Sequence, residues 1–193
     1  MGNLHSVQNA LNYLNQKNII TSDLNEIKKC DKLILPGVGS FYQARKNLSK
    51  MKLDTVIIEL VSKKKIDILG ICLGMQLLCE SSDEDGFSKG LNLVPIKFTL
   101  FKDSKLPKPH IGFNEVKFDP ASKLFDGLKK NTNFYFVHSY KGLPTKIINK
   151  ISYSFYSEKF VSSFEYNNIY GTQFHPEKSQ SNGLTLLKNF INI

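Results

Sequence analysis

The chain is 193 residues long, with 41% hydrophobic and 22% charged residues, which indicates a single globular domain over residues 1–193. Its formal net charge of +9 could suit a nucleic acid, but Arg45 is the only arginine and the lysines are spread along the chain. We therefore expect no nucleic-acid partner. A basic face that attracts a phosphorylated metabolite or an acidic protein stays open as an alternative.

The apolar stretches near the N-terminus are short and interrupted by polar residues, so we expect neither a signal peptide nor a membrane span. The three cysteines, Cys30, Cys72 and Cys79, form no paired framework and no Cys-x-x-Cys zinc pattern. Unpaired thiols suit a reducing compartment and leave one thiol available for catalysis. We expect a cytoplasmic protein with no metal, no cofactor and no membrane partner.

Helical and strand patterns alternate in the first half of the chain. Apolar residues recur at helical spacing from Leu4 to Leu14, with Asn3 available as a cap, and residues 23–26 resemble a capping box. Further strands are predicted at 19–21, 33–35 and 66–69, and further helices at 41–48 and 55–62. This alternation is typical of a doubly wound α/β sheet with helices on both faces, in which ligands bind beyond the carboxyl ends of the strands.

Two glycine-containing loops follow predicted strands of this sheet. The loop Pro36-Gly37-Val38-Gly39 lacks the third glycine of a dinucleotide fingerprint, because Tyr42 takes that position, but its backbone amides can approach a ligand closely. An ordinary strand-to-helix turn is the alternative.

The second loop, Gly70-Ile71-Cys72-Leu73-Gly74, interrupts an apolar run and predicts a strand, a sharp turn and a helix. Such a turn presents the Cys72 side chain as a nucleophile at the sheet edge, with backbone N–H groups beside it. A buried cysteine between two packing glycines is the alternative.

Beyond an acidic stretch at 81–86, the pattern changes to short β-rich segments separated by Pro, Gly, Asn and Lys. Strands are predicted at 96–101, 115–118, 134–138, 151–156, 161–166 and 169–174, and a closing amphipathic helix at 184–193. We therefore expect the complete sheet to be mixed.

Among four histidines, His175 is the strongest candidate to serve a thiol. It ends a predicted strand, Pro176 bars that strand from continuing, and Glu177 lies two residues on, where an extended chain points both side chains the same way. The carboxylate can accept the Nδ1–H bond and leave Nε2 to exchange a proton with Cys72. An exposed histidine at a strand end is the alternative.

Two motifs resemble the signatures of class I, triad-type glutamine amidotransferases. They are Gly70-Ile71-Cys72-Leu73-Gly74-Met75-Gln76 and Gly171-Thr172-Gln173-Phe174-His175-Pro176-Glu177-Lys178-Ser179. Within that family, further motifs at 1–7, 35–41, 109–114 and 136–140 resemble the glutaminase subunits of histidine biosynthesis, in the right order over nearly the whole chain.

The resemblance implies a reaction and three catalytic roles. Cys72 would be the nucleophile that attacks the side-chain carboxamide of glutamine, His175 the acid and base, and Glu177 the group that orients His175. Glutamine would be hydrolysed through a thioester to glutamate and ammonia.

The resemblance also implies binding groups around the substrate. Backbone N–H groups of Leu73 and of the Val38–Gly39 turn would hold the oxyanion. The Gln76 side chain and the backbone of Ser139 and Tyr140 would contact the bound glutamine. A polar helix face and an ordinary strand end are the alternatives for these last positions.

In this family, the ammonia passes into a (β/α)₈-barrel cyclase subunit that makes imidazole glycerol phosphate and aminoimidazole carboxamide ribotide. The resemblance therefore implies a heterodimer with such a barrel. The positions that match the neighbourhood of that interface are Phe113, Asn114, Tyr135 and Lys178.

Two features depart from the family pattern. Met1 already lies inside the first motif, so we expect the usual first strand to be absent and the sheet to have an open edge. Phe113 stands where tryptophan is common, which keeps open a related glutaminase that feeds a sugar amidotransferase in surface-polysaccharide synthesis. A non-catalytic regulatory relative, and a protease or esterase with a similar turn, are further alternatives.

Overall fold

The computed structural model describes residues 4–102, 106–148 and 150–193. Its main sheet is nine-stranded and mixed, with the order β1-β2-β11-β10-β8-β5-β3-β4, while β9 also pairs with β10. These strands are β1 (Lys32–Gly37), β2 (Asp67–Cys72), β3 (Cys79–Ser82), β4 (Ser88–Lys89), β5 (Val94–Leu100), β8 (Tyr140–Gly142), β9 (Lys150–Tyr156), β10 (Glu158–Tyr166) and β11 (Ile169–Thr172). A two-stranded sheet pairs β6 (His110–Val116) with β7 (Thr132–His138).

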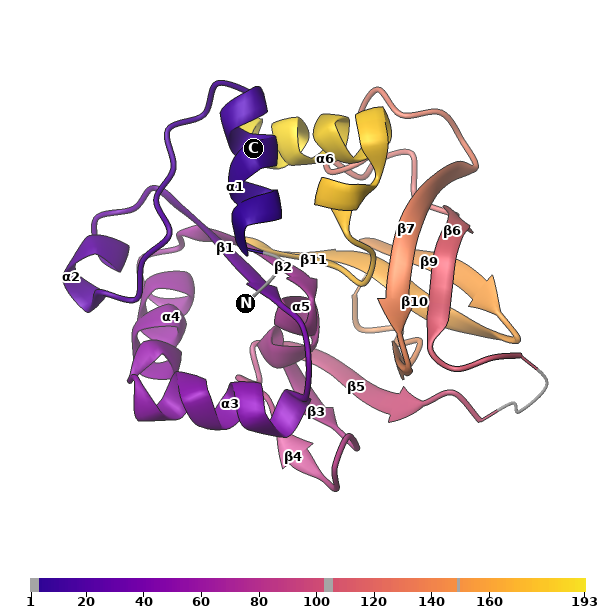
Figure 1. Ribbon diagram of the computed structural model, residues 1–193, viewed down its shortest axis with the longest axis horizontal. Helices are drawn as coiled ribbons and strands as arrows, with labels where there is room; N and C mark the ends of the chain where they lie inside the picture. Colours follow the sequence, from indigo (N-terminus) through magenta and orange to yellow (C-terminus); the bar gives the residue numbers. More distant parts are fainter. Residues whose placement is uncertain (1–3, 103–105, 149) are drawn as a thin grey trace.

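Helices cover both faces of the sheet (Figure 1). On one face lie α1 (Leu4–Tyr13) and α6 (Gln180–Asn192), and on the other α3 (Phe41–Lys50), α4 (Leu53–Ser62) and α5 (Leu73–Leu78). In β2, Ile68 packs into the cluster that holds residues of α3 and α4, whereas Leu69 packs into the cluster of α1 and α6. This alternation follows from the two-residue period of a strand, and it confirms the predicted α/β fold.

Local signals set the starts of two helices. The Asp23 carboxylate accepts hydrogen bonds from the backbone N–H groups of Asn25 and Glu26 and caps α2 (Leu24–Ile27). The Ser40 hydroxyl accepts from Gln43 N and caps α3. Asn3, the expected cap of α1, lies outside the described residues.

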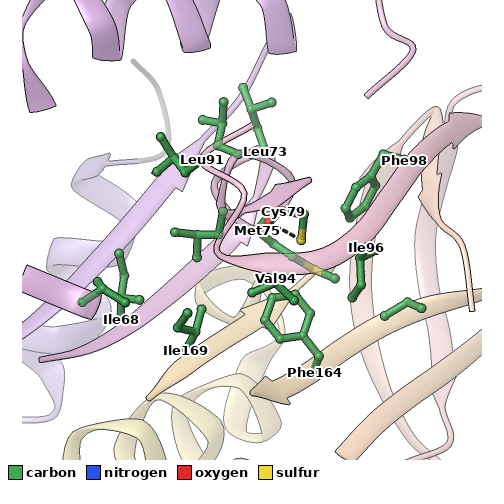
Figure 2. Close-up of a cluster of buried hydrophobic side chains, with 14 of the residues drawn as sticks. Ile68, Leu73, Met75, Cys79, Leu91, Val94, Ile96, Phe98, Phe164 and Ile169 are labelled. Atoms are coloured by element: carbon green, nitrogen blue, oxygen red, sulfur yellow. Dashed lines mark hydrogen bonds between the residues drawn. The ribbon is translucent and has the colours of Figure 1, made fainter. Parts of the chain in front are cut away.

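The core on the α3–α5 side holds α5 against the sheet. Figure 2 shows Leu73 and Met75 of α5 among side chains of β2, β5, β10 and β11. The Cys79 thiol lies in the same cluster, donates to Met75 O at 3.2 Å and is 0% exposed. Burial therefore raises the pKa of Cys79 well above its usual value and keeps this thiol protonated near neutral pH.

The structure corrects several sequence expectations. Residues 19–21 are not a strand; Ile19 and Ile20 are 53% and 42% exposed and pair with no described neighbour. The strand expected at 115–118 is β6, which begins at His110 and ends at Val116. The strands β3, β4 and β8 were not expected, because they are short and gain their hydrogen bonds from distant segments.

The main sheet ends at β1, whose outer edge pairs with no strand among the described residues. A pocket of 640 Å³ lies along this edge and is lined largely by apolar side chains of α1, α4, β1 and α6. Among the described residues, no helix has the length and apolar character needed to cross a membrane.

Candidate active site

Cys72 occupies a strained turn between β2 and α5. It is the last residue of β2 and precedes Leu73, the first residue of α5. Its φ of 53° and ψ of −111° lie outside the regions that side chains other than glycine prefer. Such strain, about 1–3 kcal/mol, persists only where the surrounding structure enforces it. The sharp turn expected from the sequence is therefore present.

Close packing on both sides enforces this turn. A Cβ atom at Gly74 would lie 1.6 Å from Leu35 O, and one at Gly70 would lie 2.6 Å from Met75 N. Both glycines let α5 approach the strands more closely than any larger residue allows. The two glycines therefore have both expected roles: they allow close packing of α5, and through it they hold the turn that presents Cys72.

His175 and Glu177 form a buried pair. His175 Nδ1 lies 2.9 Å from Glu177 Oε1, and both side chains are 0% exposed. The pairing was expected from an extended chain, but Pro176 instead begins a short 3₁₀ helix, Pro176–Lys178. The fixed φ of proline suits the first position of a helix, and this turn brings the carboxylate back to the ring.

The charge on His175 follows from its neighbours. Burial is the largest single influence and lowers the pKa of His175. The hydrogen bonds and negative charges of Cys72 and Glu177 together outweigh it and raise that pKa to about 9. Near neutral pH, the ring is therefore protonated and sits beside the Cys72 sulfur.

The Cys72 sulfur has further polar neighbours. Its Sγ lies 3.8 Å from Val137 O and 3.7 Å from Gln173 Nε2. Cys72 as a whole is 7% exposed. The contacts with Val137 of β7 and with Gln173, just beyond β11, fix the orientation of its side chain.

The loop after β1 lies beside the Cys72 turn. In the parallel pairing of β1 with β2, Gly37 is opposite Cys72, so the Val38–Gly39 turn follows at the same sheet edge. Gly39 has a φ of +101°, which favours glycine, and Val38 is 48% exposed. The structure therefore brings Val38, Gly39 and Leu73 to the end of β2 where Cys72 lies.

The expected substrate-binding residues lie on two different elements. Gln76 is on α5 and donates through Nε2 to Gln173 Oε1 at 3.1 Å. Ser139 O accepts from Phe101 N at 3.2 Å, and Tyr140 O lies 2.7 Å from His138 Nδ1. Their carbonyls thus already have donors, and Cys72 contacts the same segment at Val137 O.

Sequence reasoning did not single out Gln173, or His110 and His138, as parts of this region. Gln173 and His175 are two residues apart, and strand alternation places such residues on one side of the chain. That spacing is the signal that could have identified Gln173. His110 and His138 pair across β6 and β7 at 3.1 Å and are 28 residues apart, so no local pattern reveals them.

The described residues contain no candidate metal site. In residues 4–102, 106–148 and 150–193, no group of three or more His, Cys, Asp and Glu side chains is placed to hold a metal ion. The pocket beside β1 contains neither Cys72 nor His175 among its lining residues. The chemistry therefore centres on the carboxyl ends of β2 and β11.

Comparisons with known proteins agree with this geometry. Residues 2–193 match the family described as glutamine amidotransferase class-I. The chain is 43% identical over 195 residues to "Imidazole glycerol phosphate synthase subunit HisH 1" of Parasynechococcus marenigrum, covering 99% of this chain and 93% of that protein. It is 46% identical over 191 residues to "Imidazole glycerol phosphate synthase subunit HisH" of Pyrococcus furiosus, covering 98% and 93%.

A solved structure shows the same fold. The structure titled "Crystal structure of glutamine amidotransferase" superposes with a TM-score of 0.76 over 97% of this chain and 92% of that chain, at 13% identity. At this identity, the likeness concerns the fold alone.

Proposed function

This chain belongs to the class-I glutamine amidotransferase family, and from that premise we propose that Cys72, His175 and Glu177 are its catalytic triad. The observation that carries the proposal is the buried His175–Glu177 pair, with Nδ1 2.9 Å from Oε1, beside Cys72, whose interaction with the ring helps to raise the pKa of His175. A carboxylate, an imidazole and a thiol in this order are what nucleophilic acyl transfer requires.

The first half of the proposed reaction releases ammonia. The Cys72 thiolate attacks the carboxamide carbon of glutamine and forms a tetrahedral oxyanion. The N–H groups of Leu73 and of the Val38–Gly39 turn stabilise the oxyanion, and one such donor contributes about 10²–10³ in rate. Protonated His175 gives its proton to the amide nitrogen, the C–N bond breaks, and ammonia leaves a glutamyl thioester on Cys72.

The second half regenerates the enzyme. Neutral His175 removes a proton from water, and the resulting hydroxide attacks the thioester carbonyl. The C–S bond breaks, glutamate leaves, and the sulfur is again a thiolate beside protonated His175. We assign Gln76 and the Ser139–Tyr140 backbone to glutamine binding. Gln76 hydrogen-bonds Gln173, which in turn contacts the Cys72 sulfur. The same sulfur contacts Val137 O, shortly before Ser139 and Tyr140 in the chain.

The chain is a glutamine amidotransferase subunit of imidazole glycerol phosphate synthase and acts in histidine biosynthesis, since its curated relatives carry that name over nearly their full length. This assignment favours the histidine pathway over the sugar amidotransferase that Phe113 left open. It also means that the chain works with a partner subunit.

We infer that this partner is a (β/α)₈-barrel cyclase that receives the ammonia. Exposed apolar side chains support this inference: Ile111 and Phe113 of β6 and Phe155 of β9 are 59%, 52% and 68% exposed. The ring of Phe113 contacts Tyr135 with centroids 5.6 Å apart, and Lys178 Nζ lies 5.8 Å from the Tyr135 ring centroid. Because Lys178 directly follows Glu177, a partner docked here would lie next to the site of ammonia release.

Two further expectations belong to this proposal. We propose that residues 1–193 act as one glutaminase domain, which fits the family match over residues 2–193. We also propose a cytoplasmic location. The unpaired thiols of Cys30, Cys72 and Cys79 support it, because reducing compartments keep thiols free.

A glutamate-release assay tests the triad. Cys72→Ala, co-purified with the proposed barrel partner, is expected to lose glutamate release by about 10³-fold or more, because no thioester can form. Cys79→Ala is the matched control, since that thiol is buried away from the triad, and it should keep native turnover if it folds. Native turnover by Cys72→Ala would overturn the proposal.

A further inference from the structure

Gln173 is a fully buried polar side chain that joins two residues of the candidate site. It is 0% exposed, its Nε2 lies 3.7 Å from Cys72 Sγ, and its Oε1 accepts from Gln76 Nε2 at 3.1 Å. Burying a primary amide is unfavourable unless its groups are hydrogen-bonded. Here, both ends of the amide face residues of the site, so Gln173 is more than a space-filling core residue.

The backbone fixes where this amide lies. Gln173 N donates to Ser162 O of β10 at 2.8 Å, and His175 N donates to Tyr135 O of β7 at 2.8 Å. Between them, Phe174 is 0% exposed and stacks on Phe134 with centroids 4.1 Å apart. Gln173 and His175 therefore extend from one rigid segment, and both reach the Cys72 sulfur.

The charge on the sulfur decides what it needs from its neighbours. As a thiol, Cys72 can donate its proton to Val137 O at 3.8 Å. As a thiolate it has no proton to give, and the same carbonyl oxygen then faces a negative charge. An amide N–H favours the charged form of an acceptor, so the N–H of Gln173 offsets the carbonyl of Val137.

We propose that Gln173 is a positioning residue that holds the Cys72 sulfur in its charged form beside His175 and links it to Gln76. The proposal rests on the assignment of Cys72 as the nucleophile. Because Gln173 is fully buried, whereas Cys72 and Gln76 are 7% and 5% exposed, it acts through these two residues and does not touch substrate.

Two substitutions separate the hydrogen bond from the shape of the side chain. Gln173→Met keeps an unbranched chain but removes the N–H donor. Gln173→Glu keeps the outline and replaces the donor with an oxygen, which opposes a negative sulfur more strongly. The matched control is Gln43→Met on α3, where the exposed amide donates to Asn47 Oδ1 at 2.9 Å, away from the triad.

The measurement is the rate at which iodoacetamide alkylates Cys72 in the full chain, followed by mass spectrometry of the Cys72 peptide from pH 5 to 10. In Gln173→Met, we expect alkylation at pH 7 to be about 10-fold slower, because the donor to the sulfur is lost. Alkylation of Gln173→Glu should be slower still, and Gln43→Met should match the native profile. With the barrel protein present, kcat should fall by a similar factor while KM changes by less than about 3-fold.

Native alkylation profiles in both Gln173 variants, with native kcat, would overturn the proposal and leave Gln173 as a packing residue. A thermal midpoint measured on the same samples detects misfolding, and if Gln173→Met is unstable, the isosteric Gln173→Glu decides the matter. Alkylation needs no glutamine turnover. A fully active Cys72→Ala would therefore overturn the proposed function, whereas an unchanged alkylation profile would overturn only the role of Gln173.

Discussion

His175 is a charged buried histidine, whereas the nearby His110 and His138 form a buried pair that is neutral. His175, after β11, has a pKa raised to about 9 and is protonated near neutral pH. His110 on β6 and His138 on β7 have pKa values lowered to about 4 and about 3. Burial lowers the pKa in all three, so the difference comes from the partners: His175 faces a carboxylate and a thiol, whereas His110 and His138 face each other and neutral groups.

The neutral pair has defined tautomers. His138 Nδ1 lies 2.7 Å from Tyr140 O, an acceptor only, so Nδ1 carries the proton. His138 Nε2 then accepts from His110 Nδ1 at 3.1 Å, and His110 Nε2 accepts from Asn114 Nδ2 at 3.3 Å. Protonating either ring would break this chain of hydrogen bonds.

The two regions also influence each other. The positive charge on His175 is one of the causes that lower the pKa of His138, after burial. His138 in turn bonds the carbonyl of Tyr140, three residues along the chain from Val137, whose carbonyl contacts Cys72. One buried ring is therefore charged, whereas its two neighbours are neutral, and His138 holds the backbone through its hydrogen bond to Tyr140 O.

We expect the largest effect on kcat from a substitution of His175, the charged ring. His175→Asn should lower kcat for glutamate release by about 10³-fold or more, because both the acid and the base of the proposed cycle are lost. The matched change His110→Asn keeps a polar side chain in the neutral pair and should retain kcat within about 10-fold. Equal losses in the two variants, measured with the barrel protein present, would contradict the division of roles.

Glu177→Gln tests what makes His175 differ from His110 and His138, because it removes only the carboxylate. We expect kcat to fall by about 10²–10⁴-fold, because an amide no longer selects the required tautomer or stabilises the imidazolium. The pKa of His175 should fall below 9, since burial then acts with less opposition. Histidine NMR titration measures this directly, and an unchanged pKa would show that the carboxylate is not what keeps the ring charged.

The smallest expected effect concerns stability and pH. Because the pKa values of His110 and His138 are lowered, their contribution to the free energy of unfolding is present above pH 6.5. This contribution is lost as the pH falls toward 4 and 3. The double variant His110→Phe/His138→Leu should therefore lose less stability than the native chain between pH 7.5 and 4.5, by about 2 kcal/mol or more. Urea unfolding at the two pH values checks this.

The control for that experiment is His175→Asn, because His175 changes the stability with pH in the opposite direction. The raised pKa of His175 stabilises the fold below pH 6.5, and this contribution is lost as the pH rises through about 9. His175→Asn should therefore flatten the alkaline side of the stability profile and leave the acid side unchanged. If both variants flattened the same side of the stability profile, the assignment of a charged His175 and a neutral His110–His138 pair would be wrong.

The sequence predicted elements well where the signal is local. The Asp23 capping box, the helices after Ser40 and Cys72, and β2 follow from residues a few positions apart, and the structure confirms them. The sequence predicted strands poorly where pairing with a distant segment decides whether a strand forms. Cys79–Ser82 is polar yet forms β3, because β4 and β5 pair with it, whereas the apolar residues 19–21 form no strand in the absence of a described neighbour.

The candidate site divides in the same way. The sequence by itself determined where the cysteine turn and the His175–Glu177 pair lie, because glycine or proline marks each of them within a few positions. The strain at Cys72, by contrast, is enforced by packing against β1, where Leu35 O leaves no room for a Cβ atom at Gly74. Only the tertiary structure decided that Gln173 reaches Cys72 across 101 residues, and that His110 and His138 meet across 28. Such contacts depend on how strands are ordered and paired within the sheets, and a one-dimensional pattern does not specify that order.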